Sequence, residues 1–153
     1  MTAEPGANTN ISRMRDHTFL YTQIESALAS QLHIPHHARP AFAAKLRHLR
    51  NLGIPRSRPG SGKRISYTRL DARELLLALL VESVGSAPRT AAGVASRWRN
   101  AERVHDFVAV LPGERTIFAT HERIFDLLRT QAVLTIVNIG RASSDLEKTL
   151  ERP

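Results

Sequence analysis

The spacing of apolar residues changes along the chain, and this change constrains the fold more than any other feature. In the first two thirds, apolar residues recur every three or four positions, as in Ile24, Leu28 and Leu32, which predicts amphipathic helices. Further on they form short continuous runs, Phe107–Leu111 and Ala132–Ile139, which predict buried strands. We therefore predict an α+β protein with a helical N-terminal part and a small C-terminal sheet.

The first two helices have recognisable ends. Thr22 and Glu25 have the spacing of a capping box, which predicts a helix from there to about Leu32. Pro40 suits the first position of a second helix, and Gly53 suits its left-handed end. The expected buried stripe of this second helix consists of Phe42, Leu46 and Leu49.

A basic, glycine-rich segment follows the second helix. Pro55–Tyr67 reads PRSRPGSGKRISY, which predicts a β-hairpin with its reversal at the glycines. Thr68 and Asp71 then begin a third, largely buried helix that Gly85 ends. A fourth, shorter helix is expected over Pro88–Trp98.

The remaining chain predicts a β-β-α-β-α module. Phe107–Leu111 and Arg115–Ala119 form a hairpin, and Thr120 caps the helix that follows. Ala132–Ile139 supplies a third strand, and Ser144 caps a terminal helix. Three short strands of this kind make a small sheet with helices on at least one face.

Positive charge is concentrated in one third of the sequence. The formal net charge is +8, and no acidic residue lies between Glu25 and Asp71. Outside that window, 13 basic residues nearly balance the 14 acidic ones. Such a block is typical of polyanion binding, because contacts with phosphates release condensed counterions. The nine basic residues of the window are Arg39, Lys45, Arg47, Arg50, Arg56, Arg58, Lys63, Arg64 and Arg69.

The outer face of the second helix suits a DNA groove. At about 100° per residue, Arg47, His48 and Asn51 project opposite the apolar stripe, and small alanines beside them permit close approach. Arginine and asparagine can make bidentate contacts with guanine and adenine. Four residues are expected at base edges: Arg47, His48, Arg50 and Asn51. Six are expected at phosphates: Lys45, Arg56, Arg58, Lys63, Arg64 and Tyr67.

Residues 21–88 resemble the winged helix-turn-helix of MerR-type transcription regulators. Tyr21–Glu25 (YTQIE) is similar to the opening of that family's first helix, and Leu46–Ile54 (LRHLRNLGI) to its second. Gly62–Tyr67 (GKRISY) is similar to the wing, and Thr68–Gly85 to the helix after it. The resemblance implies DNA binding with the second helix in the major groove. It places Arg47 at the family's DNA-contacting arginine, and Arg64 and Tyr67 on the wing near the backbone.

The chain also departs from that family. His48 and Leu49 replace its usual aromatic pair, and the long C-terminal dimerisation helix and metal-binding cysteines are missing. We therefore expect neither its promoter untwisting nor its metal sensing. The expected organisation is a flexible tail over residues 1–16, a winged helix-turn-helix DNA-binding domain over 17–100, and a small α+β module over 101–153. One such domain covers few base pairs, so we expect a homodimer assembled through the C-terminal module.

The sequence predicts a sequence-specific double-stranded DNA-binding protein that regulates transcription, for example as a repressor. Two alternatives stay open: an excisionase-like or architectural accessory factor, and an interaction protein whose C-terminal module binds a protein partner or a small effector. An enzyme acting on nucleic acid is disfavoured, because the C-terminal carboxylates form no recognisable metal-binding set. No catalytic residue is therefore assigned.

Other residue classes predict absences. The chain has no cysteine, and His33, His36 and His37 lie in a turn without a nearby carboxylate, so we expect no metal site and no cofactor. No apolar run approaches the length of a membrane span, and the N-terminus lacks the apolar core of a signal peptide. We accordingly expect no membrane partner and a cytoplasmic, nucleoid-associated protein.

Overall fold

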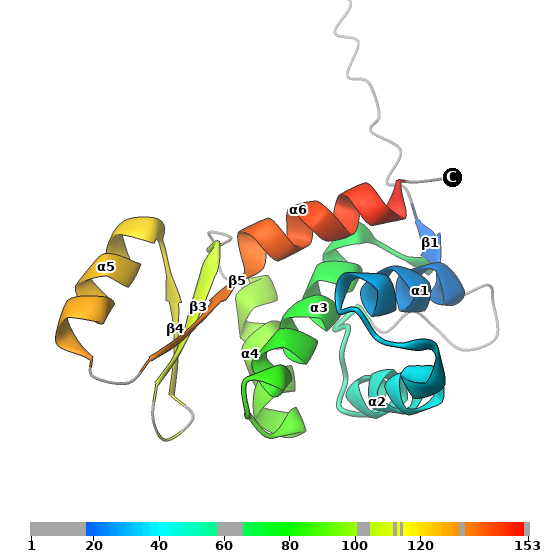
Figure 1. The fold of residues 1–153 in the computed structure, drawn as a ribbon, viewed down its shortest axis with the longest axis horizontal. Coiled ribbons are helices and arrows are strands. Elements are labelled where there is room, and N and C mark those ends of the chain that lie inside the picture. The colour runs from blue at the N-terminus through cyan, green and yellow to red at the C-terminus, as the bar shows by residue number, and fades with distance from the viewer. Residues whose placement is uncertain are drawn as a thin grey trace, which may run out of the picture.

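The computed structural model describes residues 18–57, 66–100, 105–111, 113, 115–131 and 134–151. Within these ranges the chain is mixed helix and strand, which confirms the α+β class (Figure 1). The elements are, in order, β1 (Phe19–Leu20), α1 (Tyr21–Gln31), the 3-10 helix η1 (His36–Ala38), α2 (Arg39–Asn51), β2 (Ser66–Tyr67), α3 (Arg69–Ser83), α4 (Pro88–Asn100), β3 (Phe107–Leu111), β4 (Arg115–Ala119), α5 (His121–Thr130), β5 (Thr135–Asn138) and α6 (Ile139–Leu150).

Helix α3 is the central element of the helical part, as its apolar sequence predicts. Residues Leu75–Leu79 are all buried, so the helix is covered on several sides. It contacts α1, α2, α4 and α6. The expected cap is also present: the Thr68 N–H donates to Asp71 Oδ2 at 2.8 Å, and the Asp71 N–H donates to Thr68 Oγ1 at 3.2 Å. Gly85 follows the helix with φ 99°, which an L side chain rarely adopts.

Two helix starts differ from the prediction. Helix α1 begins at Tyr21, and its first turn is closed by the Leu20 N–H donating to Gln23 Oε1 at 2.8 Å, not by a Thr22–Glu25 capping box. The reason is that β1 fixes the chain directly before α1. Helix α6 begins well before Ser144, because the Asn138 side chain accepts a 2.9 Å hydrogen bond from the Arg141 N–H.

The basic segment after α2 is described at its two ends. Ser66–Tyr67 is extended as predicted, but it pairs antiparallel with Phe19–Leu20. Arg56 and Ser57 lie in a turn instead of a strand. Residues 58–65, where the hairpin tip is expected, lie outside the described residues. Within the described residues, the strand that pairs with Ser66–Tyr67 is therefore the one directly before α1.

The C-terminal sheet has three antiparallel strands in the order β4-β3-β5. In its register Val108 faces Val137, and both belong to the core that the sheet shares with the helical part. The other face packs on α5, whose Ile124 and Leu127 meet Ala109 in a second, smaller core. The predicted β-β-α-β-α order is therefore correct, and the sheet is covered on both faces (Figure 1).

Helix α6 returns across the helical part of the molecule (Figure 1). It contacts α1 and α3, and Leu146 is fully buried among their residues. Two ion pairs join α3 to this part of the chain: Arg73 with Glu147 on α6, and Arg69 with Glu151, the residue directly after α6, at 2.6 Å. One hydrophobic core consequently contains residues from both sides of the boundary that the sequence suggested at residue 101.

Candidate nucleic-acid interface

The outer face of α2 is exposed in the way the periodicity predicts. Phe42, Leu46 and Leu49 are buried, whereas Arg47 and His48 point to solvent from the opposite side. Asn51 is exposed at the end of the helix, and Ala41 and Ala44 are exposed on the same surface. Small and polar side chains thus share one accessible helix face, and no acidic residue occurs in α2.

Lys45 lies at the edge of this face and has a partner. Its Nζ is 3.0 Å from Glu82 Oε1 on α3, and the Glu82 side chain is only 14% exposed. The sequence predicted that Lys45 contacts a phosphate, but it did not predict this ion pair, because Glu82 is far from Lys45 in the chain. Lys45 is therefore partly neutralised before any ligand arrives.

Two tyrosines pack behind Arg50. The Arg50 guanidinium carbon lies 5.2 Å from the centroid of the Tyr21 ring, a cation–π arrangement that orients an otherwise exposed side chain. The rings of Tyr21 and Tyr67 are 6.0 Å apart. Tyr67 itself is fully buried, and burial raises the pKa of its hydroxyl. Tyr67 was expected at a phosphate, but its ring packs in the hydrophobic core without solvent-exposed surface, so that contact stays a prediction.

A buried ionic network holds the start of the basic segment. Arg99 Nη1 donates to Asp71 Oδ1 at 2.5 Å and to Glu74 Oε2 at 2.7 Å. The backbone N–H of Arg56 donates to both carboxylate oxygens of Glu74, at 3.2 and 3.1 Å. Since Asp71 also accepts from the Thr68 N–H, adjacent carboxylates of α3 fix both ends of the segment between residues 56 and 68.

The two carboxylates respond differently to this surrounding. Burial raises the pKa of Glu74, and its hydrogen bonds from Arg99 and the Arg56 N–H only partly oppose that effect. Burial also acts to raise the pKa of Asp71, but hydrogen bonds from Thr68 and Arg99 outweigh it and leave this pKa below its ordinary value. Asp71 was predicted as a capping residue and Arg99 as a marker of the end of the fourth helix, but neither their ion pair nor the role of Glu74 was predicted.

The predicted phosphate contacts of this segment divide into two groups. The Arg56 side chain is exposed, next to the network that holds its backbone. Arg58, Lys63 and Arg64 lie outside the described residues. The anchored ends nevertheless fix where this basic segment leaves and rejoins the helical part.

A groove of about 450 Å³ continues from the end of α2 toward α4. Asn51 and Gly53 line its α2 side, and Arg89, Gly93 and Ser96 line its α4 side. Arg89 is exposed and adds a cation that sequence analysis did not select, because it lies outside the acid-free window. The candidate interface therefore extends from Arg47 across Asn51 to Arg89.

No protein-family model, curated protein or solved structure matches the chain. The assignment of a function consequently depends on the chemistry of the surface formed by α2, Arg56 and Arg89. Within the described ranges, no three His, Cys, Asp or Glu side chains are grouped so that they could hold a metal ion. None of the helices in the same part of the chain is long and apolar enough to span a membrane.

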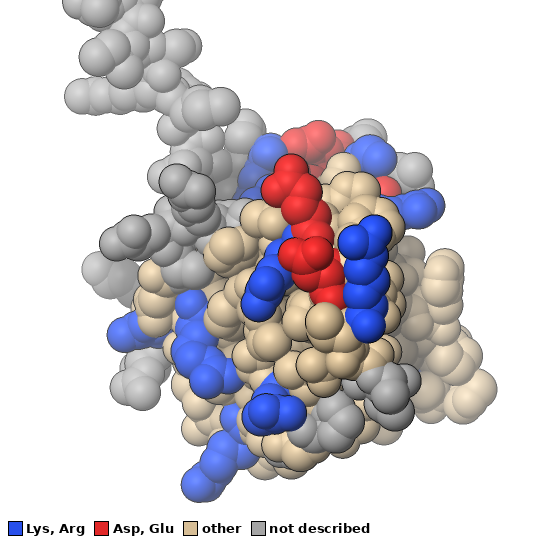
Figure 2. Space-filling view, turned by 90° about the vertical axis from the view of Figure 1, so that its left-hand side faces the viewer, with Lys and Arg blue, Asp and Glu red and all other residues tan. Residues whose placement is uncertain are grey.

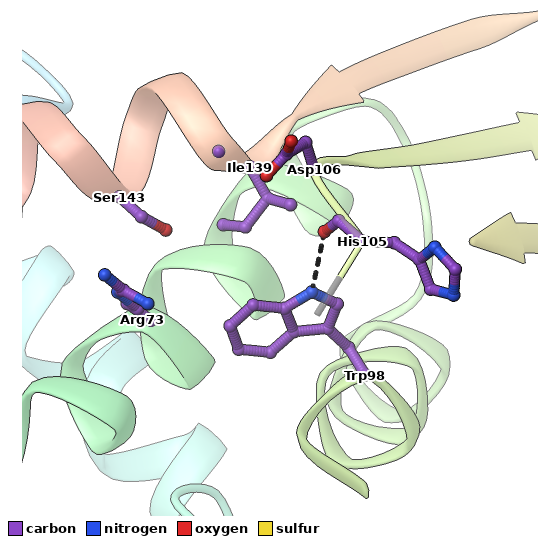
Figure 3. Close-up of a pocket in the computed structure, with 7 residues that line it drawn as sticks. Arg73, Trp98, His105, Asp106, Ile139 and Ser143 are labelled. Carbon is purple, nitrogen blue, oxygen red and sulfur yellow. Dashed lines mark hydrogen bonds between the residues drawn. The ribbon is translucent and has the colours of Figure 1, made fainter. Parts of the chain in front are cut away.

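A second, smaller cavity of about 100 Å³ lies where α3, α4 and α6 meet the start of β3 (Figure 3). The indole of Trp98 forms one wall, and its Nε1 donates to the His105 carbonyl at 3.1 Å. The side chains of Arg73 and Ser143 face the same space (Figure 3). Small-molecule sites usually measure about 300–1,000 Å³, so we assign no effector to this cavity.

Proposed function

We propose that the protein binds double-stranded DNA sequence-specifically and regulates transcription, with α2 as the helix that enters the major groove. The observation that carries the proposal is the exposed, acid-free face of α2, on which Arg47, His48 and Asn51 stand opposite a buried apolar stripe. The order of α1, α2, extended β2 and α3 also agrees with the resemblance of residues 21–88 to MerR-type winged helix-turn-helix domains.

Base recognition follows from side-chain chemistry. The major groove is wide enough for an α-helix, and small residues such as the exposed Ala41 and Ala44 permit a close approach. Arg47 offers paired N–H donors for the O6 and N7 atoms of guanine, and Asn51 offers a donor and an acceptor for adenine. Arg50, oriented by Tyr21, lies beside them.

Phosphate contacts would come from exposed cations outside this helix. Arg56 stands on the anchored basic segment, together with Arg58, Lys63 and Arg64, which the sequence places between its ends. Arg89 borders the groove on the α4 side. Cations near a groove-reading helix hold its register on the duplex through phosphate contacts, without reading sequence themselves.

The test is to select a bound sequence from random duplex DNA and then compare variants on it. Asn51→Ala should lower discrimination at one base pair by about 1–3 kcal/mol. Arg64→Glu should weaken binding to every sequence and flatten the dependence of log K on log salt by about one unit or more. Arg123→Ala, which removes a charge from exposed α5, should leave both quantities unchanged.

Unchanged affinity and discrimination in both the Asn51 and Arg64 variants would refute the proposal. The same selection separates the regulator from an architectural factor, because an architectural protein tolerates many sequences and bends them. A homodimer is part of the proposed mode of binding, since a single groove helix contacts few base pairs.

A further inference from the structure

Helix α5 exposes large apolar side chains on its outer side. Phe125 is 55% exposed and Leu128 is 52% exposed, although Ile124 and Leu127 already bury the inner side against the sheet. The helix lies at the opposite end of the molecule from α2 (Figure 1). Exposed apolar pairs of this kind, bordered by charges, are typical of protein interfaces.

The charges around this apolar pair have a specific order. At about 100° per residue, Glu122 and Arg129 both fall within roughly 60° of Phe125 on one flank, while Leu128 lies on the other flank. Glu122 and Arg129 are exposed and sit at opposite ends of the helix, about 10 Å apart along its axis. Asp126 and Arg123 lie further from Phe125 around the helix circumference. Figure 2 looks onto this end of the molecule and shows acidic side chains bordered by basic ones.

We propose that this face of α5 binds the same face of a second copy of the chain, with the two helices antiparallel about a two-fold axis near Phe125. In that arrangement each flank of the helix lies beside the same flank of the partner helix. A residue near the start of one helix therefore lies beside a residue near the end of the other. Glu122 then lies beside Arg129 of the partner subunit, and Arg129 beside the partner's Glu122, so each dimer contains two identical ion pairs. In a parallel arrangement the two flanks would be exchanged and these pairs would not form.

The charge pattern favours a second copy over an unrelated partner. One end of the flank is acidic and the other is basic, so the flank is complementary to a copy of itself when the two helices are antiparallel. The position of α5 agrees with this choice, since contact there leaves the α2 face of both copies exposed (Figure 1). The proposed dimer uses α5 and leaves α6 in its contacts with α1 and α3. It does not depend on the proposed DNA binding.

Sedimentation equilibrium of the full chain without DNA tests the interface. The wild type should dimerise, and Phe125→Ser and Leu128→Ser should each raise the dimer Kd by about tenfold or more, because each removes apolar contact on both sides of the axis. Val84→Ser is the matched control, since Val84 is an apolar residue that is 39% exposed on the helical part. A monomeric wild type at high micromolar concentration, or equal loss in the control, would overturn the proposal.

A charge exchange tests the orientation. Glu122→Arg and Arg129→Glu should each raise the dimer Kd by roughly five- to thirtyfold, because each places two like-charged pairs across the axis. The double variant should recover near wild-type Kd. Independent, additive losses would exclude the antiparallel pairing. Because the readout is self-association alone, it stays interpretable whether or not Asn51→Ala affects DNA binding.

Discussion

The guanidinium of Arg99 donates a 2.7 Å hydrogen bond to the carboxylate of Glu74, a side chain with no solvent exposure. This bond joins the end of α4 to the middle of α3. Glu74 in turn accepts the backbone N–H of Arg56. This charge pair therefore holds the start of the basic segment that we propose to contact DNA.

Replacing Arg99 should be costly for stability. Arg99→Met leaves the carboxylates of Asp71 and Glu74 buried without their cation, and removal of one partner from a buried pair typically costs about 3–5 kcal/mol. Urea denaturation measures the free energy of unfolding. Arg97→Met is the control, because exposed Arg97 donates to the neutral Thr116 hydroxyl at 2.9 Å and its replacement should change that free energy by less than about 0.5 kcal/mol. Equal effects in the two variants would contradict the assigned role.

Glu74 should give stability an inverse dependence on pH. Its folded pKa is raised above 4.5, so between 4.5 and that folded pKa the folded state binds more protons than the unfolded state. The contribution of this group to stability therefore decreases as pH rises through that window. Urea titrations of wild type and Glu74→Gln across acidic pH should show the wild-type advantage shrinking with rising pH.

Asp71 should behave in the opposite way. Its folded pKa lies below 3.8, so its stabilising contribution is fully present above pH 3.8 and is lost as pH falls through the folded pKa. The difference in unfolding free energy between wild type and Asp71→Asn should accordingly grow as pH rises toward 3.8. If the difference in unfolding free energy between wild type and variant changed with pH in the same direction for Asp71→Asn and Glu74→Gln, one of the two assignments would be incorrect.

Releasing Lys45 should strengthen DNA binding. Glu82→Gln removes the carboxylate that lies 3.0 Å from Lys45 Nζ, which frees a cation at the edge of α2. We expect tighter binding at low salt and a dependence of log K on log salt that is steeper by up to about one unit. Asp126→Asn makes the same charge change on α5, outside the proposed ion pairs of the dimer, and should alter neither value. A Glu82 variant indistinguishable from that control would place Lys45 outside the contact surface.

Two glycines in helices should respond oppositely to alanine. A Cβ at Gly140 would lie 2.6 Å from Asp106 Oδ1 and 3.0 Å from Asp106 Cβ, so Gly140→Ala should destabilise by about 1–3 kcal/mol. Gly93 in α4 has no atom within 4 Å of such a Cβ, and Gly93→Ala should stabilise by about 0.5–1 kcal/mol through helix propensity. Thermal unfolding of both variants measures the contrast. Destabilisation by both substitutions would contradict the assignment of the Gly140→Ala effect to the contact with Asp106.

Local patterns in the sequence were sufficient to predict most elements. The i, i+4, i+7 spacing of Phe42, Leu46 and Leu49 predicted both α2 and its exposed opposite face, because helix geometry ties spacing to direction. The Thr68–Asp71 spacing predicted the start of α3 for the same local reason. The acid-free window between Glu25 and Asp71 could be identified directly, because the order of charges along the chain does not depend on the fold.

Only the tertiary structure decided the long-range pairings. Tyr67 lies in the core, Lys45 pairs with Glu82, and Arg99 joins Asp71 and Glu74 across separate helices. Helix α6 packs on α1 and α3, although the sequence grouped it with the C-terminal sheet. Periodicity specifies which face of a helix is apolar, but the partner that covers it depends on how all the helices pack together, and that information is not local.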